Sequence, residues 1–359
     1  MNLHILPRAG EQVRARRARA LLVSSILAVG LVASIVLSVA SGQLAVSPAE
    51  LLHIIGKPFG FDWGVAPTLP TAEAGFWTVR LPRIVMALLV GAALAVAGLL
   101  MQAVFGNPLA EPGVVGVSSG AAVGACSAIV FGLTMFGEWT VPAFAFGAGL
   151  LTMLLVYVFS RSRGRTEVIT LILTGVAVNA FAGAALAFLS FVASAGAREQ
   201  IVFWQLGSMN GARWVQVAVI VPIIVVAILV SSLLTRRLDL LSLGEKSARN
   251  LGVNVERLRL VAIVLVALLT AAAVSFVGIV AFVGLVLPHL MRMILGPAHG
   301  PLLITSVLGG ALLMTLADLF ARTAVPMADL PLGMLTALVG GPFFFFLIWR
   351  TRRTSGGWA

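Results

Sequence analysis

Apolar runs of about 20 residues recur along almost the whole chain, and they limit its fold more than any other feature. A helix needs about 20 apolar residues to cross a bilayer, and in lipid such runs form helices because every backbone group needs an internal partner. We predict ten spans, at residues 21–41, 84–104, 114–132, 141–160, 168–192, 214–235, 258–278, 280–295, 301–320 and 331–349. The pair 258–278 and 280–295 also fits one long helix broken near Gly278. We expect residues 1–359 to form one all-α membrane domain.

The composition agrees with a membrane protein and excludes several other classes. Charged residues make up 10% of the chain, against about 25% in a typical soluble domain. The net charge of +11 does not indicate nucleic-acid binding, because the basic residues lie in short clusters between apolar runs. Cys126 lies in an apolar segment and the four histidines are scattered, so we expect no metal site. The run 21–41 is too long for a signal-peptide core of about 7–15 residues, so we expect it to be the first span.

The distribution of basic residues predicts the orientation. Ten spans place both termini on one side of the membrane. With that side in the cytoplasm, 18 of the 24 lysines and arginines fall in cytoplasmic segments. The other six are Lys57, Arg80, Arg83, Arg198, Arg213 and Arg322. This bias predicts that both termini are cytoplasmic.

Two absences narrow the functional class. No acidic residue lies deep in a predicted span, and Asp318, the nearest, lies toward an outer end. Ion-coupled carriers usually place carboxylates near the midplane, so an ion-coupled secondary transporter is the less favoured alternative. Gly244-Glu245-Lys246-Ser247 lacks the preceding phosphate loop, so ATP would be hydrolysed by another chain. We find no catalytic constellation, and therefore no support for an intramembrane enzyme.

Small and amide side chains recur at helical spacing in several spans. Such stripes indicate close helix packing or the wall of a transport pathway. The glycine and alanine stripes are Gly91, Ala95 and Gly98, and Gly116, Gly120 and Gly124. In span 168–192, Asn179 is flanked by Gly175 and Gly183 at four residues on either side. A buried amide needs partners, so Asn179 either joins helices or lines the pathway.

Polar features at the two membrane faces carry further information. In the cytoplasmic loop, Ser242 and Glu245 match the pattern of a capping box, and Gly252 suits the end of a short helix. This helix over 241–253 is either interfacial or a docking surface for a cytoplasmic partner. At the outer face, Arg80, Arg83 and Arg322 either reach lipid phosphates or form a cationic rim for an acidic partner.

Short motifs, in order over nearly the whole chain, resemble a known family. They are Arg80-Leu81-Pro82-Arg83, Asn107-Pro108-Leu109-Ala110-Glu111-Pro112-Gly113, Gly116-Val117-Ser118-Ser119-Gly120, Trp204-Gln205-Leu206-Gly207, Leu243-Gly244-Glu245, Leu287-Pro288-His289 and Leu330-Pro331-Leu332-Gly333. On these motifs the chain resembles the FecCD-type permeases, the membrane subunits of type II ABC importers for ferric siderophores, heme and cobalamin.

The resemblance implies the ten-helix type II importer fold in a bacterial inner membrane. It implies a homodimer of permeases that binds two ATP-binding-cassette ATPase subunits and one periplasmic substrate-binding protein, surrounded by lipid. The ATPase subunits would use ATP and Mg²⁺, and this chain would bind no cofactor and have no enzyme activity of its own.

The resemblance also assigns roles to residues. Arg80, Arg83 and Arg322 would receive the binding protein, and Gly175, Asn179 and Gly183 would line the substrate pathway. The coupling helix, residues 241–253, would contact the ATPase through Leu243, Gly244, Glu245, Ala248, Leu251 and Gly252. Residues 201–212 and the long first outer loop look most like those of bacterial heme permeases. Heme is therefore favoured, with ferric siderophores and cobalamin as alternatives.

Overall fold

The computed structural model describes residues 9–42, 46–162 and 164–354, which are largely helical. The helices are α1 (Ala9–Ala40), α2 (Pro48–Gly56), α3 (Ala72–Gly75), α4 (Leu81–Phe105), α5 (Val117–Val130), α6 (Thr140–Phe159), α7 (Val168–Val192), α8 (Ala195–Leu206), α9 (Trp214–Leu241), α10 (Glu245–Asn250), α11 (Val255–Val277), α12 (Val283–Leu295), α13 (His299–Thr323) and α14 (Leu332–Thr354). Short helical turns are η1 (Lys57–Phe59), η2 (Phe76–Arg80), η3 (Pro112–Val115) and η4 (Gly137–Trp139). Strands β1 (Arg161–Ser162) and β2 (Arg165–Thr166) form a small antiparallel hairpin.

The apolar helices lie at the positions of the ten predicted spans. Within the described residues, seven helical segments are long and apolar enough to cross a membrane, and α5, α12 and residues 332–346 are shorter apolar helices. The all-α membrane fold is thus confirmed, whereas a crossing by each of the ten remains a prediction. α5 and α12 are shorter than predicted, with 14 and 13 residues, because η3 precedes α5 and a non-helical segment precedes α12. α11 ends at Val277 and α12 begins at Val283, so the helix is interrupted at Gly278, a feature common to the two alternatives for residues 258–295.

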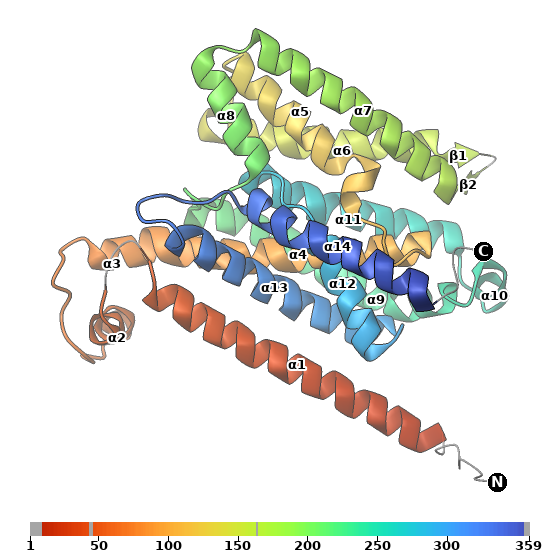
Figure 1. The fold of residues 1–359 in the computed structure, drawn as a ribbon, viewed down its shortest axis with the longest axis horizontal. Coiled ribbons are helices and arrows are strands. Elements are labelled where there is room, and N and C mark those ends of the chain that lie inside the picture. Colours follow the sequence, from red (N-terminus) through yellow and green to blue (C-terminus); the bar gives the residue numbers. More distant parts are fainter. Residues whose placement is uncertain (1–8, 43–45, 163, 355–359) are drawn as a thin grey trace.

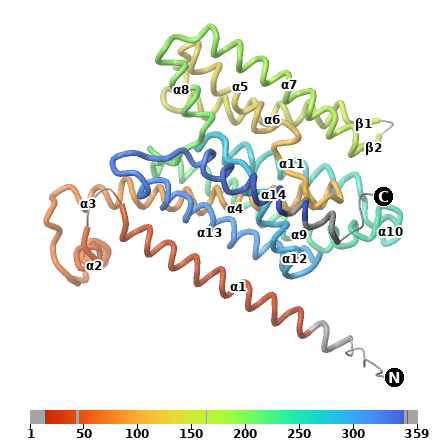
Figure 2. The backbone as a smooth tube through the Cα atoms, in the orientation of Figure 1, coloured from red at the N-terminus to blue at the C-terminus, as the bar shows by residue number. Residues whose placement is uncertain are grey.

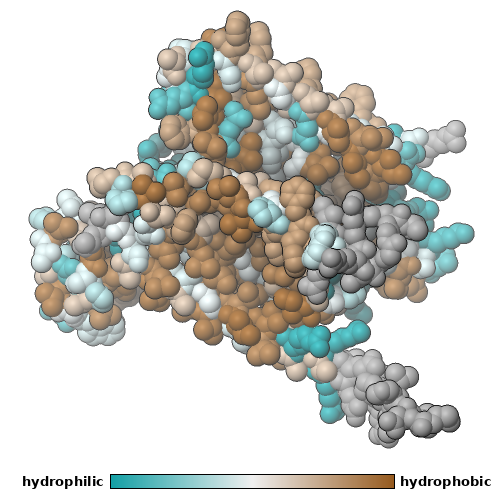
Figure 3. All heavy atoms as spheres, in the orientation of Figure 1, coloured by the Kyte–Doolittle hydropathy of each residue, from teal (hydrophilic) through white to brown (hydrophobic). Residues whose placement is uncertain are grey.

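The helices form two packed groups with α1 at one edge. α4 packs against α9, α11, α12 and α13, and α5 packs against α6, α7 and α8 (Figure 1). α11 joins the groups through α5 and α6. Figure 3 shows apolar residues over the sides of this bundle and hydrophilic residues gathered toward its ends.

The two ends of the bundle differ in what they carry. We call the end with α10 and the β hairpin the inner end, and the end with α2 and α3 the outer end. The N-terminal half of α1 and the C-terminal half of α14 both lie toward the inner end (Figures 1 and 2). This placement agrees with termini on one side, although the chain ends and Arg8 and Arg163 lie outside the described residues. The cytoplasmic location of this end remains a prediction.

Glycines bring α4 into backbone contact with its neighbours. A Cβ atom on Gly98 would lie 1.8 Å from the carbonyl oxygen of Gly284, and one on Gly91 would lie 2.1 Å from that of Gly310. Gly120 and Gly124 lie similarly against α6. The packing interpretation of both small-residue stripes is therefore confirmed.

Replacing Gly98 with valine is expected to lower the free energy of unfolding by about 3 kcal/mol, because overpacking here moves backbone rather than a flexible side chain. The matched control is Gly147→Val in α6, where nothing lies within 4 Å of the added Cβ. Thermal unfolding in detergent measures both variants. Equal melting temperatures would contradict the predicted backbone contact.

The outer loop, residues 42–83, contains helices that the sequence analysis missed. α3 and the π-helical turn η2 continue into α4, so this helix begins near Ala72 rather than at residue 84. In η2 the N–H of Leu81 donates to the carbonyl of Phe76, five residues earlier. The next residue, Pro82, has no N–H to donate. α2 begins with a capping box between Ser47 and Glu50, and Pro48 is at its first position.

Glu50 holds the outer loop together. Its carboxylate accepts hydrogen bonds from the backbone N–H groups of Thr68 and Ser47, both at 2.7 Å, and from the Thr68 hydroxyl at 2.8 Å. The Thr68 and Ser47 backbone hydrogen bonds lower the pKa of Glu50 from 4.5 to about 2. Because these bonds need the ionised carboxylate, their stabilisation is complete above pH 4.5 and is lost as the pH falls toward 2.

We therefore expect amide hydrogen exchange of residues 47–70, corrected for intrinsic rates, to stay constant above about pH 4.5 and to accelerate below it. Glu50→Gln is the control, and its corrected exchange should be fast at every pH. A wild-type profile that is flat down to pH 2 would contradict this role.

Candidate functional site

The inner surface is shaped by α10, the centre of the predicted coupling helix. Gly244, with φ of 100°, ends the turn after α9 and lets the chain enter α10. α10 ends in a Schellman motif, in which Gly252 N donates to Arg249 O and Val253 N donates to Ala248 O, both at 3.0 Å. Gly252 has φ of 83°, so the prediction that it ends this helix is confirmed.

The predicted coupling residues occupy different environments on this surface. Leu243 and Leu251 flank α10 with 64% and 58% of their surfaces exposed. Ala248 is fully buried against the bundle. The structure therefore presents two exposed leucines at the inner end, on a helix anchored by Ala248.

One prediction for this segment is wrong. Ser242 does not cap α10: its hydroxyl donates to the carbonyl of Asp239 in the last turn of α9. The helix begins at Glu245 with Gly244 as N-cap, and it spans six residues instead of 241–253. Gly244 accounts for the difference, because its positive φ cannot continue a right-handed helix from Ser242.

A buried arginine, which the sequence analysis counted only as a topology signal, joins three elements beneath α10. The Arg259 side chain is 6% exposed and forms an ion pair with Glu245 of α10. It also donates to the carbonyl of Thr166 in β2 at 3.3 Å and lies 3.6 Å from a Glu256 oxygen. The N–H of Thr166 donates to the other Glu256 oxygen at 2.9 Å. Arg259 thus connects α10 to the start of α11 and to the hairpin that precedes α7.

The three outer arginines lie together, but they are buried. Each is 8–9% exposed. Arg83 donates to Asp318 at 2.8 Å and to Asp329 at 3.0 Å, and so joins α4 to α13 and to the loop before α14. Arg322 donates to the carbonyls of Ser38 and Ser41, at 2.6 and 2.7 Å.

Arg80 completes this arrangement by donating to the carbonyl of Val39 at 2.6 Å. Arg80 and Arg322 therefore satisfy carbonyl groups at the C-terminal end of α1, which no intrahelical N–H can reach. Asp318 is only 1% exposed and, as expected, lies near the outer end of its helix. These contacts within the chain replace the expected reach to lipid phosphates, whereas a docking role remains a prediction.

The predicted pathway residues do not share one environment. The Asn179 side chain accepts a hydrogen bond from Ser119 at 2.6 Å and donates to the carbonyls of Gly113 and Val114. A Cβ on Gly175 would lie 2.4 Å from the Val114 oxygen. Gly183 is exposed, with nothing within 4 Å of its Cβ position. The interhelical interpretation of Asn179 is confirmed, and a pathway role for the three residues remains a prediction.

Sequence analysis also missed a carboxylate near the middle of the bundle, because Glu111 falls between predicted spans. Its side chain accepts a hydrogen bond from Phe282 N, at the N-terminus of α12, at 2.9 Å. It lines a cavity of about 200 Å³ together with Leu94, at the centre of α4, and Ser119, the partner of Asn179. The hydrogen bond offsets part of the unfavourable burial of this group by completing a helix end.

Comparisons with known proteins agree with this architecture. The model of the FecCD transport family matches residues 30–350. The hemin transport system permease protein HmuU of Yersinia pestis is 41% identical over 78% of this chain and 84% of its own length. The cobalamin import system permease protein BtuC of Halobacterium salinarum is 40% identical over 77% of this chain and 74% of its own length.

A solved structure gives the same result for the fold. It shows an inward-facing transporter described as being of the metal-chelate ABC type, with a TM-score of 0.79 and 34% identity. The match covers 91% of this chain and 98% of that one. The chain therefore belongs to the FecCD transport family of ABC importer permeases.

Proposed function

We propose that this permease moves heme from the periplasm to the cytoplasm across a bacterial inner membrane, driven by a separate ATPase subunit. The 41% identity to a hemin permease supports the substrate. The exposed Leu243 and Leu251 beside α10 support the ATPase contact, because both are large apolar side chains that a partner at the inner end could cover. ATP binding would move α10, and the Arg259 connection would carry that movement toward α7.

A pair of these chains with two ATPase subunits and one periplasmic binding protein completes the proposed importer. Three phenylalanines of α7 are largely exposed: Phe181, Phe188 and Phe191, at 77%, 61% and 82%. This exposed apolar surface supports a contact between α7 and either a second copy of the chain or lipid. Gly183, on the same helix, would contribute to the pathway between two copies. Acidic side chains of the binding protein would approach the outer arginines between the ends of α1 and α13.

Uptake by reconstituted vesicles tests this proposal. Permease, ATPase and binding protein are placed in proteoliposomes, and entry of radiolabelled heme is measured with and without ATP. We expect ATP-dependent heme uptake and much slower uptake of a ferric siderophore. Uptake driven by an ion gradient without the ATPase would contradict the proposal in favour of a secondary transporter.

Cobalamin is the second candidate, because the cobalamin permease of Halobacterium salinarum is almost equally similar, at 40% identity. The same vesicles, supplied with equal concentrations of heme or cyanocobalamin, separate the two substrates. Faster uptake of cyanocobalamin than of heme would replace heme with cobalamin and leave the importer class intact.

A further inference from the structure

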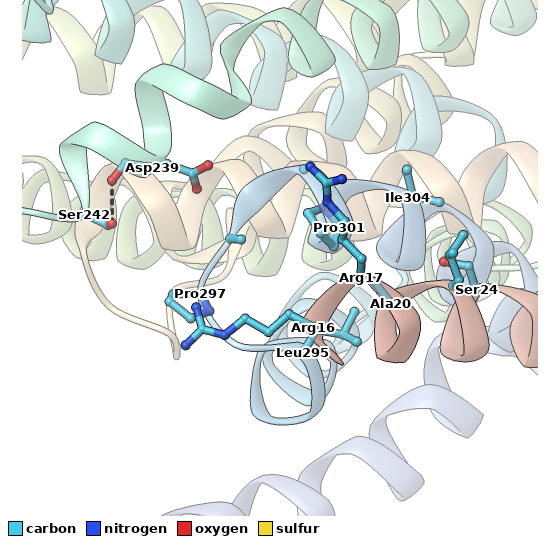
Figure 4. Close-up of a pocket in the computed structure, with 13 residues that line it drawn as sticks. Arg16, Arg17, Ala20, Ser24, Asp239, Ser242, Leu295, Pro297, Pro301 and Ile304 are labelled. Atoms are coloured by element: carbon cyan, nitrogen blue, oxygen red, sulfur yellow. Dashed lines mark hydrogen bonds between the residues drawn. The ribbon is translucent and has the colours of Figure 1, made fainter. Parts of the chain in front are cut away.

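A pocket at the inner end carries charges that the transport function does not use. Its volume is about 710 Å³, and it lies between α1, the end of α9 and the connection from α12 to α13. Arg16 and Arg17 line it, and Figure 4 shows Arg16 extending toward Pro297 and Arg17 toward Pro301. Neither arginine forms an ion pair with a described residue. An anionic ligand is therefore the chemical match for this site.

A neighbouring carboxylate does not neutralise these arginines. Asp239 also lines the pocket, but its Oδ1 atom accepts hydrogen bonds from the backbone N–H of His299 at 2.8 Å and lies 2.7 Å from His299 Nδ1. This contact holds the end of α9 to the start of α13. Asp239 is thus engaged through Oδ1, and among the described residues it forms no ion pair with Arg16 or Arg17.

Apart from Ser24 and Ser242, the remaining side chains of the pocket are apolar, and the pocket opens toward the lipid-facing surface of α1. Leu21, Leu295 and Ile304 line it. Leu21, one helical turn beyond Arg17 on the same face of α1, is 70% exposed, and Ile304 of α13 is 56% exposed. Apolar surface that leads away from a pair of cations fits a ligand with an anionic head and hydrocarbon chains.

The depth of the arginines agrees with a lipid headgroup. α1 ends at Ala40 at the outer end. A hydrocarbon layer of about 30 Å takes roughly 20 helical residues, which places its inner edge near Leu21. Arg16 and Arg17 then lie about 6–8 Å beyond that edge, at the level of lipid phosphates.

We propose that this pocket binds an anionic phospholipid, with Arg16 and Arg17 on its phosphate and an acyl chain along Leu21 and Ile304. The lipid would join α1 to the α12–α13 connection. That junction otherwise contains a 3.5 Å hydrogen bond from Arg19 to the carbonyl of Ile294. The proposal is independent of the transported substrate.

Native mass spectrometry of the purified chain, titrated with phosphatidylglycerol or phosphatidylcholine, tests the site. Wild type is expected to bind phosphatidylglycerol selectively. Each basic residue near a lipid surface contributes about fivefold, so Arg16→Gln with Arg17→Gln should weaken that binding roughly 30-fold. The matched control is Arg236→Gln with Arg237→Gln, which removes two exposed arginines from α9 outside the pocket and should change binding little.

Three outcomes would overturn the proposal. The first is an equal loss of phosphatidylglycerol binding in the two double variants. The second is displacement of phosphatidylglycerol by millimolar inorganic phosphate, which would indicate a site for free anions. The third concerns Ala20→Phe, which fills the pocket, retains both charges and serves if the arginine variant does not fold. Unchanged lipid binding by Ala20→Phe would show that the lipid lies elsewhere.

Discussion

Replacing Asp318 with alanine is expected to lower the free energy of unfolding by about 3–5 kcal/mol, the largest effect on stability that we predict for a single side chain. Asp318 is 1% exposed and lies between two arginines. Arg83 donates to it at 2.8 Å, and Arg322 Nε lies 3.5 Å from its second oxygen. Without Asp318, two guanidinium groups remain buried with one fewer negative charge nearby. Leaving a charge uncompensated is far less favourable than losing an exposed pair.

Unfolding in mixed micelles, followed by tryptophan fluorescence, measures this effect. Glu138→Ala is the matched control, because Glu138 pairs with Arg213 and the two side chains are 55% and 60% exposed. That variant should lose no more than about 1 kcal/mol. Asp318→Asn should fall between the two, because an amide can still accept from Arg83. If Asp318→Ala and Glu138→Ala lose equal stability, the outer charge cluster does not hold α4 to α13.

The same cluster explains why docking at the outer face could not be judged from the sequence alone. The predicted spans and the distribution of basic residues placed Arg80, Arg83 and Arg322 at one membrane face, and the structure shows that they lie together. Their partners are Asp318, which is 235 residues from Arg83, and backbone carbonyls of α1. No local pattern reports which carbonyls a folded chain leaves unpaired, because that depends on how α1 ends against α13.

Two identical four-residue patterns show where local rules succeed and fail. Ser47 and Glu50 form a capping box, whereas Ser242 and Glu245, with the same spacing, do not. Pro48 fixes a helical φ directly after Ser47, whereas Gly244 adopts a positive φ before Glu245. The residue types between the two ends of the pattern therefore decide the outcome, and they were legible in the sequence.

Hydropathy was sufficient for α7, whose observed bounds equal the predicted ones, but not for α8 or Arg259. α8 is only 12 residues long, so it falls below the length that identifies a span. Ser194, whose hydroxyl accepts from Ala197 N, was a local signal for its start. Arg259 gave no signal of its own, because its partners come from α10 and β2.

Replacing Arg259 with alanine is expected to uncouple ATP hydrolysis from transport. Under the proposed function, α10 moves with the ATPase, and Arg259 is its buried connection to Thr166 and Glu256. Without the guanidinium, Glu245 loses its buried partner, and α10 can move without displacing the hairpin that leads into α7. Coupling free energies between sites are typically about 1–3 kcal/mol, so substrate moved per ATP hydrolysed should fall by a factor of about 5 to 150.

The ratio of transport to ATP hydrolysis separates this role from a purely structural one. Misfolding would lower both rates together. Uncoupling would lower transport and leave the ATPase rate within about twofold of the wild-type rate. Arg257→Ala is the matched control: Arg257 is an exposed arginine two residues earlier in α11, so its loss should leave the ratio unchanged. Arg259→Lys keeps the charge but not the planar group that reaches several acceptors, and it should restore coupling only in part. A normal ratio in Arg259→Ala would show that α10 transmits its movement by another route, through the contact of Ala248 with the bundle.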